Sequence, residues 1–184
     1  MSFSDKEKTL INFLLSYYKN KIDILFDIIN QKTSLSLRLI DWLVTNYSKK
    51  YNITYQLTKN SEIIFFNIFI DYKNQLRAYS KKFFDPFCRQ KRIIINTITL
   101  SWREYDSSED LKNCVVTTVG QLNFFKWFIE NKIFEYAIKN IRLVDNDMIA
   151  TMKNKNKSKR SVLSPSAVKG IYTNNTNITV KFKS

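Results

Sequence analysis

The chain has 184 residues and a formal net charge of +14, and 44% of its residues are hydrophobic and 15% aromatic. This apolar content suffices for a packed core, and the charge predicts an anionic partner such as nucleic acid or an acidic protein. The absence of histidine excludes histidine-based acid–base catalysis and most zinc sites, and the two glycines are too few for a P-loop or a dinucleotide-binding fingerprint.

Two helices are predicted at the start of the chain. Apolar residues recur with a 3.6-residue period over residues 5–29, which predicts one amphipathic helix. Thr33 or Ser34 can cap a second helix, whose apolar residues from Leu35 to Tyr51 cover more than one face. We therefore expect the second helix to be buried on two sides.

A β-hairpin is predicted next. Residues 53–58 alternate between apolar and polar side chains, which is typical of a strand, and residues 59–61 have the composition of a turn. Residues 62–72 are almost continuously apolar and rich in β-branched and aromatic side chains, which indicates a central strand. We expect the two strands to pair across the turn.

A strongly basic stretch covers residues 71–92, and we call it the basic segment. It carries seven cations and two acids, with aromatic residues between them. Lys73, Arg77 and Lys81 recur every four residues, so they share a side on either a helix or a strand. This spacing predicts a surface that faces an anionic partner. The cations of the basic segment are Lys73, Arg77, Lys81, Lys82, Arg89, Lys91 and Arg92.

A helix, a strand and a long helix complete the predicted domain. Residues 75–78 favour a helix, which Pro86 must end, and residues 92–100 form a second strand pattern. Residues 118–121 (TVGQ) fit a capping box, and the apolar period after them continues to residue 142. We expect an α+β fold with two N-terminal helices, a small mainly antiparallel sheet, a long C-terminal helix and a basic tail that ends in a short strand.

The composition divides the chain into a domain, residues 1–150, and a tail, residues 151–184. The tail holds eight basic residues and no acid, which leaves +6 of the net charge to the domain. Its start is low-complexity sequence and is predicted to be flexible, whereas Ile178, Val180 and Phe182 alternate with polar residues as in a strand. The cations at the start of the tail are Lys153, Lys155, Lys157, Lys159 and Arg160.

Neither a metal, a cofactor nor a membrane span is predicted. Cys88 and Cys114 lie far apart without a CxxC pair, so we expect two free thiols in a reducing compartment. The first residues do not form a signal peptide. The most apolar run, residues 63–70, is interrupted by Asn67 and is too short to cross a bilayer. The sequence therefore predicts a soluble protein that is not secreted.

Five segments have a distinctive sequence: residues 36–50 (SLRLIDWLVTNYSKK), 75–82 (QLRAYSKK), 84–89 (FDPFCR), 120–127 (GQLNFFKW) and 163–170 (LSPSAVKG). They resemble blocks of small uncharacterised proteins of nucleocytoplasmic large DNA viruses, the giant-virus group that includes mimivirus-like members. The resemblance implies a location in the cytoplasm of the infected host, in a viral factory, or in the virion. It implies no activity.

We expect a non-enzymatic nucleic-acid-binding protein that takes DNA or RNA with low sequence specificity. The seven cations of the basic segment would contact phosphates, and each neutralised phosphate would steepen the salt dependence of binding. Tyr72 and Tyr79 would stack on bases if they are exposed. The tail cations would add non-specific affinity. The sequence shows no base-reading motif, so we expect a weak sequence preference.

Two alternatives remain open, and so does the oligomeric state. A virion structural or adaptor protein would use the tail strand to join a partner's sheet and the basic segment to meet an acidic viral protein. A nuclease is the other alternative, because Asp71-Tyr-Lys73 and Gln75-x-x-x-Tyr79 resemble, piecemeal, elements of RecB-like nucleases in which an acid pair holds Mg²⁺. These elements nearly touch here, no Gly-x-x-Asp precedes them, and Glu62 is wrongly placed as a second acid. We therefore expect no catalytic residue.

Overall fold

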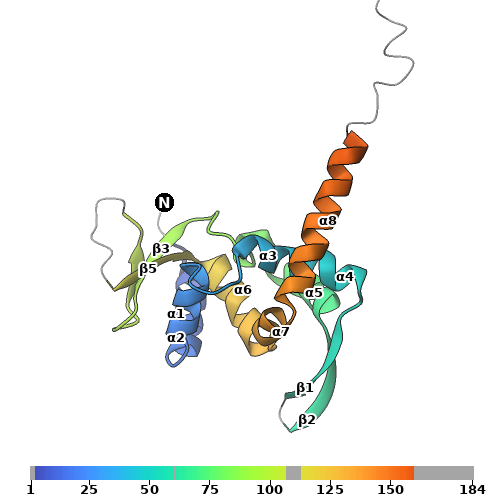
Figure 1. The fold of residues 1–184 in the computed structure, drawn as a ribbon. Coiled ribbons are helices and arrows are strands. Elements are labelled where there is room, and N and C mark those ends of the chain that lie inside the picture. Colours follow the sequence, from blue (N-terminus) through green and yellow to red (C-terminus); the bar gives the residue numbers. More distant parts are fainter. Residues whose placement is uncertain (1–2, 60, 107–112, 160–184) are drawn as a thin grey trace, which may run out of the picture. The chain divides into compact units, whose positions relative to one another are not determined.

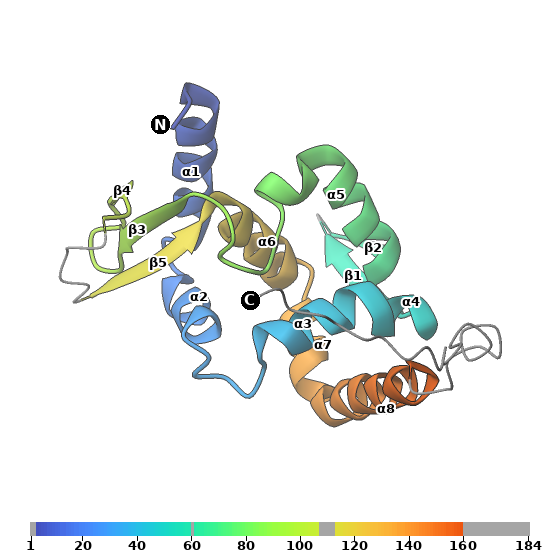
Figure 2. The same ribbon diagram turned by 90° about the horizontal axis from the view of Figure 1, so that it is seen from above.

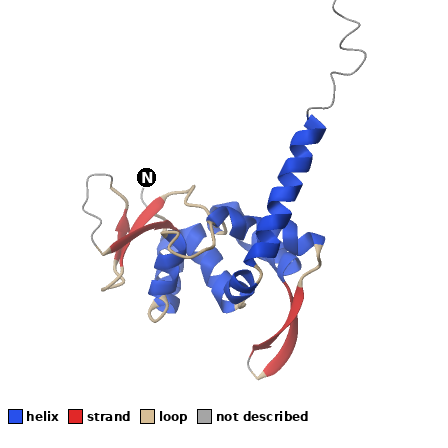
Figure 3. Ribbon diagram, in the orientation of Figure 1, coloured by secondary structure: helices blue, strands red, loops and turns tan. Residues whose placement is uncertain are grey.

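The structure is a computed structural model that describes residues 3–59, 61–106 and 113–159. Its helices and antiparallel sheets confirm the predicted α+β class (Figure 1, Figure 3). Contacts divide the chain into two units, Met1–Met148 and Ile149–Ser184. None of the helices in the described ranges combines the length and the apolar composition that a bilayer crossing demands. The strand predicted near the end of the chain lies outside the described residues.

The N-terminal amphipathic pattern forms two helices. α1 (Asp5–Tyr18) is followed by a turn in which the Lys21 N–H donates to Tyr18 O at 2.9 Å, and α2 (Ile22–Ile29) begins after it. The single helix predicted over residues 5–29 is therefore wrong at this turn. The turn contains neither glycine nor proline, and the apolar spacing continues across it, so periodicity does not reveal it.

The second predicted helix begins at Ser36, whose Oγ accepts the Leu39 N–H at 3.1 Å, and not at Thr33 or Ser34. One turn of the helix is π-helical, which shifts the register of its buried side chains. These buried side chains cover more than one face, as predicted. The segments are α3 (Leu37–Trp42), η1 (Leu43–Tyr47) and α4 (Ser48–Lys50).

The predicted hairpin is present. β1 (Thr54–Lys59) and β2 (Glu62–Asn67) pair antiparallel and form a two-stranded sheet of their own, so β2 is not the central strand that its apolar run predicts. The strand is also shorter than predicted, because Asn67 Oδ1 accepts the Ile70 N–H at 3.0 Å and caps α5 (Ile68–Phe83). In Figure 1 the hairpin extends from the helices at the lower right.

The second sheet has three antiparallel strands in the order β4-β3-β5, and the residues at the centre of β3 are buried. The predicted strand over residues 92–100 ends at Asn96, because Asn96 Oδ1 accepts the N–H groups of Ile98 and Thr99, both at 2.9 Å, and forms a turn. The strands are β3 (Arg92–Asn96), β4 (Trp102–Glu104) and β5 (Cys114–Thr118).

The predicted long C-terminal helix is three helices. The side-chain amides of Asn131 and Asn140 donate to Trp127 O at 2.8 Å and Tyr136 O at 2.9 Å, and they end the first two helices. Lys132, between the first two, has a left-handed backbone with φ 55°. The helices are α6 (Val119–Glu130), α7 (Ile133–Lys139) and α8 (Ile141–Lys159). Residues 151–159 are thus helical, where an irregular start of the tail was expected.

α6 forms the centre of the first unit. It lies between α1 and α5 (Figure 2), and nearly all of its side chains are buried. An aromatic cluster packs around Phe124, whose ring centroid lies 5.2 Å from Phe84 and 5.6 Å from Trp127. Tyr18 of α1 donates its hydroxyl to Leu122 O at 2.7 Å. These contacts fix α5 and the segment after it against a rigid core.

Candidate nucleic-acid interface

The basic segment begins within α5. The exposed side chains of this helix recur with the helical period and form one side, which we call the α5 face. Lys73 and Arg77 stand on the α5 face one turn apart, since residues four apart are neighbours on a helix. The α5 face consists of Ile70, Lys73, Asn74, Arg77 and Ala78.

Three cations of the basic segment are already paired. Lys82 Nζ lies 3.0 Å from Glu7 Oε1, and Lys91 Nζ lies 3.0 Å from Glu104 Oε1. The Arg89 guanidinium donates to both oxygens of Asp85, at 2.9 and 2.6 Å. Arg92 lies over the Tyr105 ring, with 5.7 Å between its Cζ and the ring centroid. Phosphate binding by these side chains would compete with existing contacts.

Lys73, Arg77 and Lys81 are the other cations, and all three are exposed. Within the described ranges none of them forms an ion pair with a carboxylate. Lys73 and Arg77 therefore provide the part of the basic segment that is most available to an anionic partner, whereas Lys81 interacts electrostatically with Asp41.

The backbone at Ser80 separates Lys81 from the other two. Ser80 has φ 57° and ψ 170°, a combination that is essentially restricted to glycine, and it interrupts α5. The four-residue spacing therefore places Lys73 and Arg77 on one side, but this helical geometry does not extend to Lys81. Burial raises the pKa of Asp41 in α3, and the positive charge of Lys81 opposes this rise. Lys81 is therefore close enough to α3 to interact electrostatically with Asp41.

The two tyrosines of the basic segment, Tyr72 and Tyr79, differ in exposure. Tyr72 is only 8% exposed, its ring packs 6.0 Å from Phe84 and 6.1 Å from Trp127, and burial raises its pKa to about 12. Tyr72 therefore does not meet the condition of exposure that base stacking requires, because its helical position faces the aromatic core. Tyr79 is 38% exposed and stacks on Phe84 with 6.5 Å between ring centroids, which leaves part of its ring accessible.

The end of α5 is fixed to the start of α6 by backbone contacts. A Cβ atom on Gly120 would lie 2.9 Å from Lys82 O, which is closer than such atoms approach. Asp85 N–H donates to Gly120 O at 3.2 Å, and the Asn123 side chain donates to Phe83 O at 2.9 Å. This role of Gly120 was not predicted, although the scarcity of glycine in the chain was a signal for it.

The predicted capping box at the start of α6 is half formed. Thr118 Oγ1 accepts the Gln121 N–H at 3.1 Å, as predicted. The Gln121 side chain, however, accepts from Thr117 Oγ1 at 2.9 Å and donates to Pro86 O at 2.8 Å. It thus joins the strand before α6 to the segment that follows α5.

Asp71 does not occupy a nuclease-like position. It lies in the first turn of α5 and not at the end of a strand, because β2 ends at Asn67. Its Oδ1 accepts the Trp127 indole N–H at 2.6 Å and lies 3.5 Å from Gln75 Nε2. In the described ranges no three acidic or cysteine side chains gather as a metal site would require. Asp71 therefore anchors α5 to α6.

Four of the five predicted tail cations lie at positions within α8, and the fifth follows its last residue. Lys153 is exposed on the helix, and α8 continues through the positions of the next three lysines. Arg160 lies outside the described residues. The predicted tail set, Lys153, Lys155, Lys157, Lys159 and Arg160, is therefore mostly helical in backbone.

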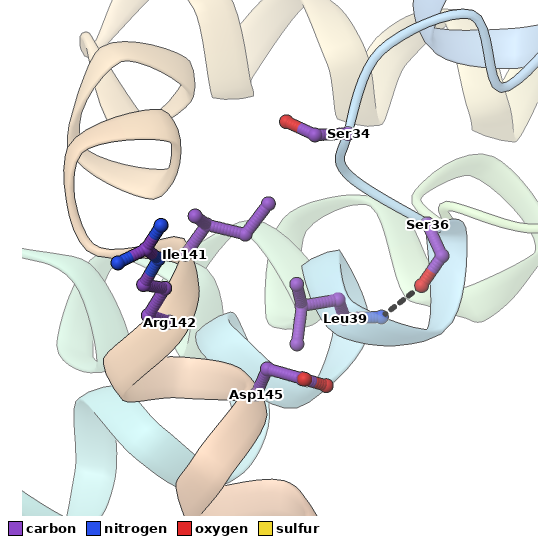
Figure 4. Close-up of a pocket in the computed structure, with 6 residues that line it drawn as sticks. All are labelled: Ser34, Ser36, Leu39, Ile141, Arg142 and Asp145. Atoms are coloured by element: carbon purple, nitrogen blue, oxygen red, sulfur yellow. Dashed lines mark hydrogen bonds between the residues drawn. The ribbon is translucent and has the colours of Figure 1, made fainter.

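A pocket of about 320 Å³ has no residue of the basic segment in its lining (Figure 4). Figure 4 shows one wall from the loop and start of α3 and the other from the start of α8. Arg142 and Asp145 give it one positive and one negative charge, which does not favour a polyanion. The lining residues are Ser34, Ser36, Leu39, Ile141, Arg142 and Asp145.

Comparison with known proteins gives two matches. Residues 1–181 match a family described as a family of unknown function, DUF7197. The uncharacterized protein L507 of Acanthamoeba polyphaga mimivirus is 37% identical over 159 residues, which cover 85% of this chain and 56% of that relative. The chain therefore spans little more than half the length of the relative. No solved structure matches the chain. The matches confirm the resemblance to uncharacterised giant-virus proteins.

Proposed function

The chain belongs to the protein family of unknown function DUF7197, and we propose that it is a non-enzymatic nucleic-acid-binding protein of a large DNA virus. Its place of action would be the viral factory in the host cytoplasm or the virion, where viral nucleic acid is present. The partner class follows from charge, since the chain carries +14 and a strongly basic surface favours a polyanion such as nucleic acid.

The observation that carries the proposal is the state of Lys73 and Arg77. Both are exposed on the α5 face, one turn apart, and neither forms an ion pair with a carboxylate in the described part of the chain. A phosphate that binds them displaces counterions and no protein partner, so the gain is not reduced by a broken ion pair. Lys82, by contrast, would have to leave Glu7.

Low sequence specificity follows from the composition of the α5 face. Sequence is read by several side chains that reach base edges, whereas lysine and arginine bound to phosphates fix position without reading sequence. On this face Ile70 and Ala78 offer no hydrogen bonds to a base edge, and Lys73 and Arg77 are assigned to phosphates, which leaves Asn74 as the one member that could read a base. We therefore expect binding that depends on charge and strand form more than on base order.

Fluorescence anisotropy of the full chain with labelled oligonucleotides tests the proposal. We expect binding at low salt to single strands of different base order with affinities that agree within about threefold. The double variant Lys73→Gln, Arg77→Gln should weaken binding to all of them equally. The variant Lys6→Gln, Lys19→Gln is the matched control, because it removes the same charge from exposed positions in and directly after α1.

Two results would overturn the proposal. One is the absence of binding at low salt by the full chain, which would favour the virion structural or adaptor alternative. The other is Mg²⁺-dependent cleavage of the oligonucleotide that is lost in Asp71→Ala, which would restore the nuclease alternative. If the α5 and α1 double variants weakened binding equally, net charge alone would explain the binding, and the α5 face would have no specific role.

A further inference from the structure

The outer side of the β1–β2 hairpin is uncharged and partly apolar. The register pairs Gln56 with Phe65 and Thr58 with Ile63, so these four side chains share one face, which we call the hairpin face. Phe65 is 76% exposed and Ile63 is 68% exposed. Exposed large apolar side chains that stand together on one face are typical of a contact surface.

The opposite side of the hairpin is anchored to the core. The Tyr55 hydroxyl donates to Asn131 O at 2.7 Å, and Lys59 Nζ donates to Asn131 Oδ1 at 2.7 Å. The Tyr55 ring also stacks on Tyr136, with 5.8 Å between centroids and 11° between planes. The hairpin is therefore held in place with Phe65 directed to solvent.

No loop separates the hairpin from the α5 face. Asn67 ends β2 and caps α5, and its Nδ2 also donates to Asn52 Oδ1 at 2.9 Å and to Thr54 Oγ1 at 2.8 Å. Measured along the strand and helix axes, about 18 Å of chain separates Phe65 from Lys73, from the rise per residue in strands and helices. Ile70, at the start of the α5 face, is exposed between them.

We propose that Phe65 is a stacking platform for a base of single-stranded nucleic acid whose phosphates bind Lys73 and Arg77. This inference rests on the proposed function and names the form of its partner. An exposed aromatic ring a few nucleotides' length from cations without a carboxylate partner among the described residues fits a single strand bound without sequence preference, because every base has a flat face to stack and every nucleotide a phosphate. In a duplex the base faces are covered by their neighbours, so Phe65 would gain little.

Binding by Phe65→Ala tests the platform. With an oligothymidylate of about ten nucleotides, we expect the variant of the full chain to bind at least about fivefold more weakly than wild type. The slope of affinity against salt should not change, because the phosphate contacts remain. Phe13→Ala is the matched control, since Phe13 is 58% exposed and stands on α1. A duplex of the same length should lose less than about twofold.

A second variant reports the contact itself. Phe65→Trp places an indole on the hairpin face, and a base stacked on it should quench its fluorescence when oligothymidylate is added. The same substitution at Phe13 gives the control for the native tryptophans, and it should show no added quenching. Addition of the duplex should leave the signal of the indole on the hairpin face nearly unchanged.

The outcomes separate this inference from the proposed function. If Phe65→Ala binds like wild type while Lys73→Gln, Arg77→Gln still lowers the salt slope, the platform is wrong and nucleic-acid binding stands. If neither changes binding, both proposals fail. If Phe65→Ala instead turns an oligomer into a monomer in sedimentation, the hairpin face is an interface between copies of the chain, and the platform is also wrong.

Discussion

At the start of α6, a single missing side chain lets two backbone segments meet. Gly120 carries no Cβ, and Lys82 O occupies the space that a Cβ would take, 2.9 Å from its ideal position. The hydrogen bond from Asp85 N–H to Gly120 O at 3.2 Å closes the contact from the other side. This position is in a helix, where alanine normally stabilises relative to glycine, so the close approach and the helix propensity act in opposite directions.

Gly120→Ala should destabilise the protein by about 1–3 kcal/mol, because the added methyl group forces the backbone at Lys82 to move. Urea unfolding followed by circular dichroism measures the change. Asn74→Ala, on the exposed side of α5, is the control and should stay within about 0.5 kcal/mol of wild type. A Gly120→Ala protein as stable as wild type would show that the junction is looser than its distances indicate.

Ser80 stores backbone strain at the end of α5. Its φ of 57° and ψ of 170° are nearly exclusive to glycine, so Ser80→Gly should stabilise the protein by about 1 kcal/mol. The same change at Ser16, exposed in the regular helix α1, should instead destabilise it by about 0.5 kcal/mol. Stability changes of opposite sign for the two variants, measured by thermal or urea unfolding, would support the strain at Ser80. Changes of the same sign would contradict it.

At the scale of elements, the N-terminus of α1 is tied to the end of α5. The Glu7 carboxylate accepts the Ser4 N–H at 2.9 Å within the capping box of α1, and its other oxygen lies 3.0 Å from Lys82 Nζ. The Ser4 backbone hydrogen bond, followed by the Lys82 contact, lowers the pKa of Glu7 from 4.5 to about 2. The ionised carboxylate therefore stabilises the cap and the contact between the two helices together.

This contact predicts a specific loss of stability in acid. A carboxyl whose pKa is lower in the folded than in the unfolded state stabilises the fold above its unfolded pKa, here 4.5, and this contribution disappears as the pH falls to about 2. Glu7→Gln should therefore flatten the dependence of the unfolding free energy on pH in that window. Asp5→Asn, an exposed acid in the same turn, is the control. Identical acid profiles for Glu7→Gln and wild type would exclude the role of Glu7.

Element types were predictable from the sequence, but several boundaries were not. The hairpin and the strand at β3 follow from alternation and β-branched runs, and α6 follows from its cap at Thr118. The apolar run from Glu62 looked like one strand, because a strand and the first turn of a buried helix are equally apolar. Its division at Asn67 depends on one side-chain hydrogen bond to the Ile70 N–H.

The positive charge of the candidate interface was predictable from the sequence, but the acids that pair with some of its cations were not. The four-residue spacing predicted that Lys73 and Arg77 share a side on a helix or a strand, and in α5 they stand one turn apart on one side. The acids that pair with Lys82 and Lys91 are Glu7 and Glu104, and only the tertiary fold brings them close. Whether Tyr72 and Tyr79 are exposed depends on which side of the helix faces the core, and here Tyr72 is buried while Tyr79 is partly exposed.

At the scale of the whole molecule, positive charge exceeds negative charge by a wide margin. The chain carries 30 basic and 16 acidic residues, so carboxylates are too few to pair with every lysine and arginine. Such an excess opposes compact folding through repulsion, and an anionic partner relieves it. Within this excess, the α5 face holds Lys73 and Arg77 one turn apart on one helix, without a carboxylate partner among the described residues.

The salt dependence of binding is the most direct test of phosphate binding by the α5 face. The full chain should bind an oligothymidylate with an association constant whose logarithm falls linearly with the logarithm of salt concentration. Lys73→Gln, Arg77→Gln should reduce the slope by about 1.4, because each phosphate contact to a single strand contributes about 0.7. The control Lys6→Gln, Lys19→Gln should leave the slope nearly unchanged. Equal slopes for wild type and the α5 double variant would contradict phosphate binding by the α5 face.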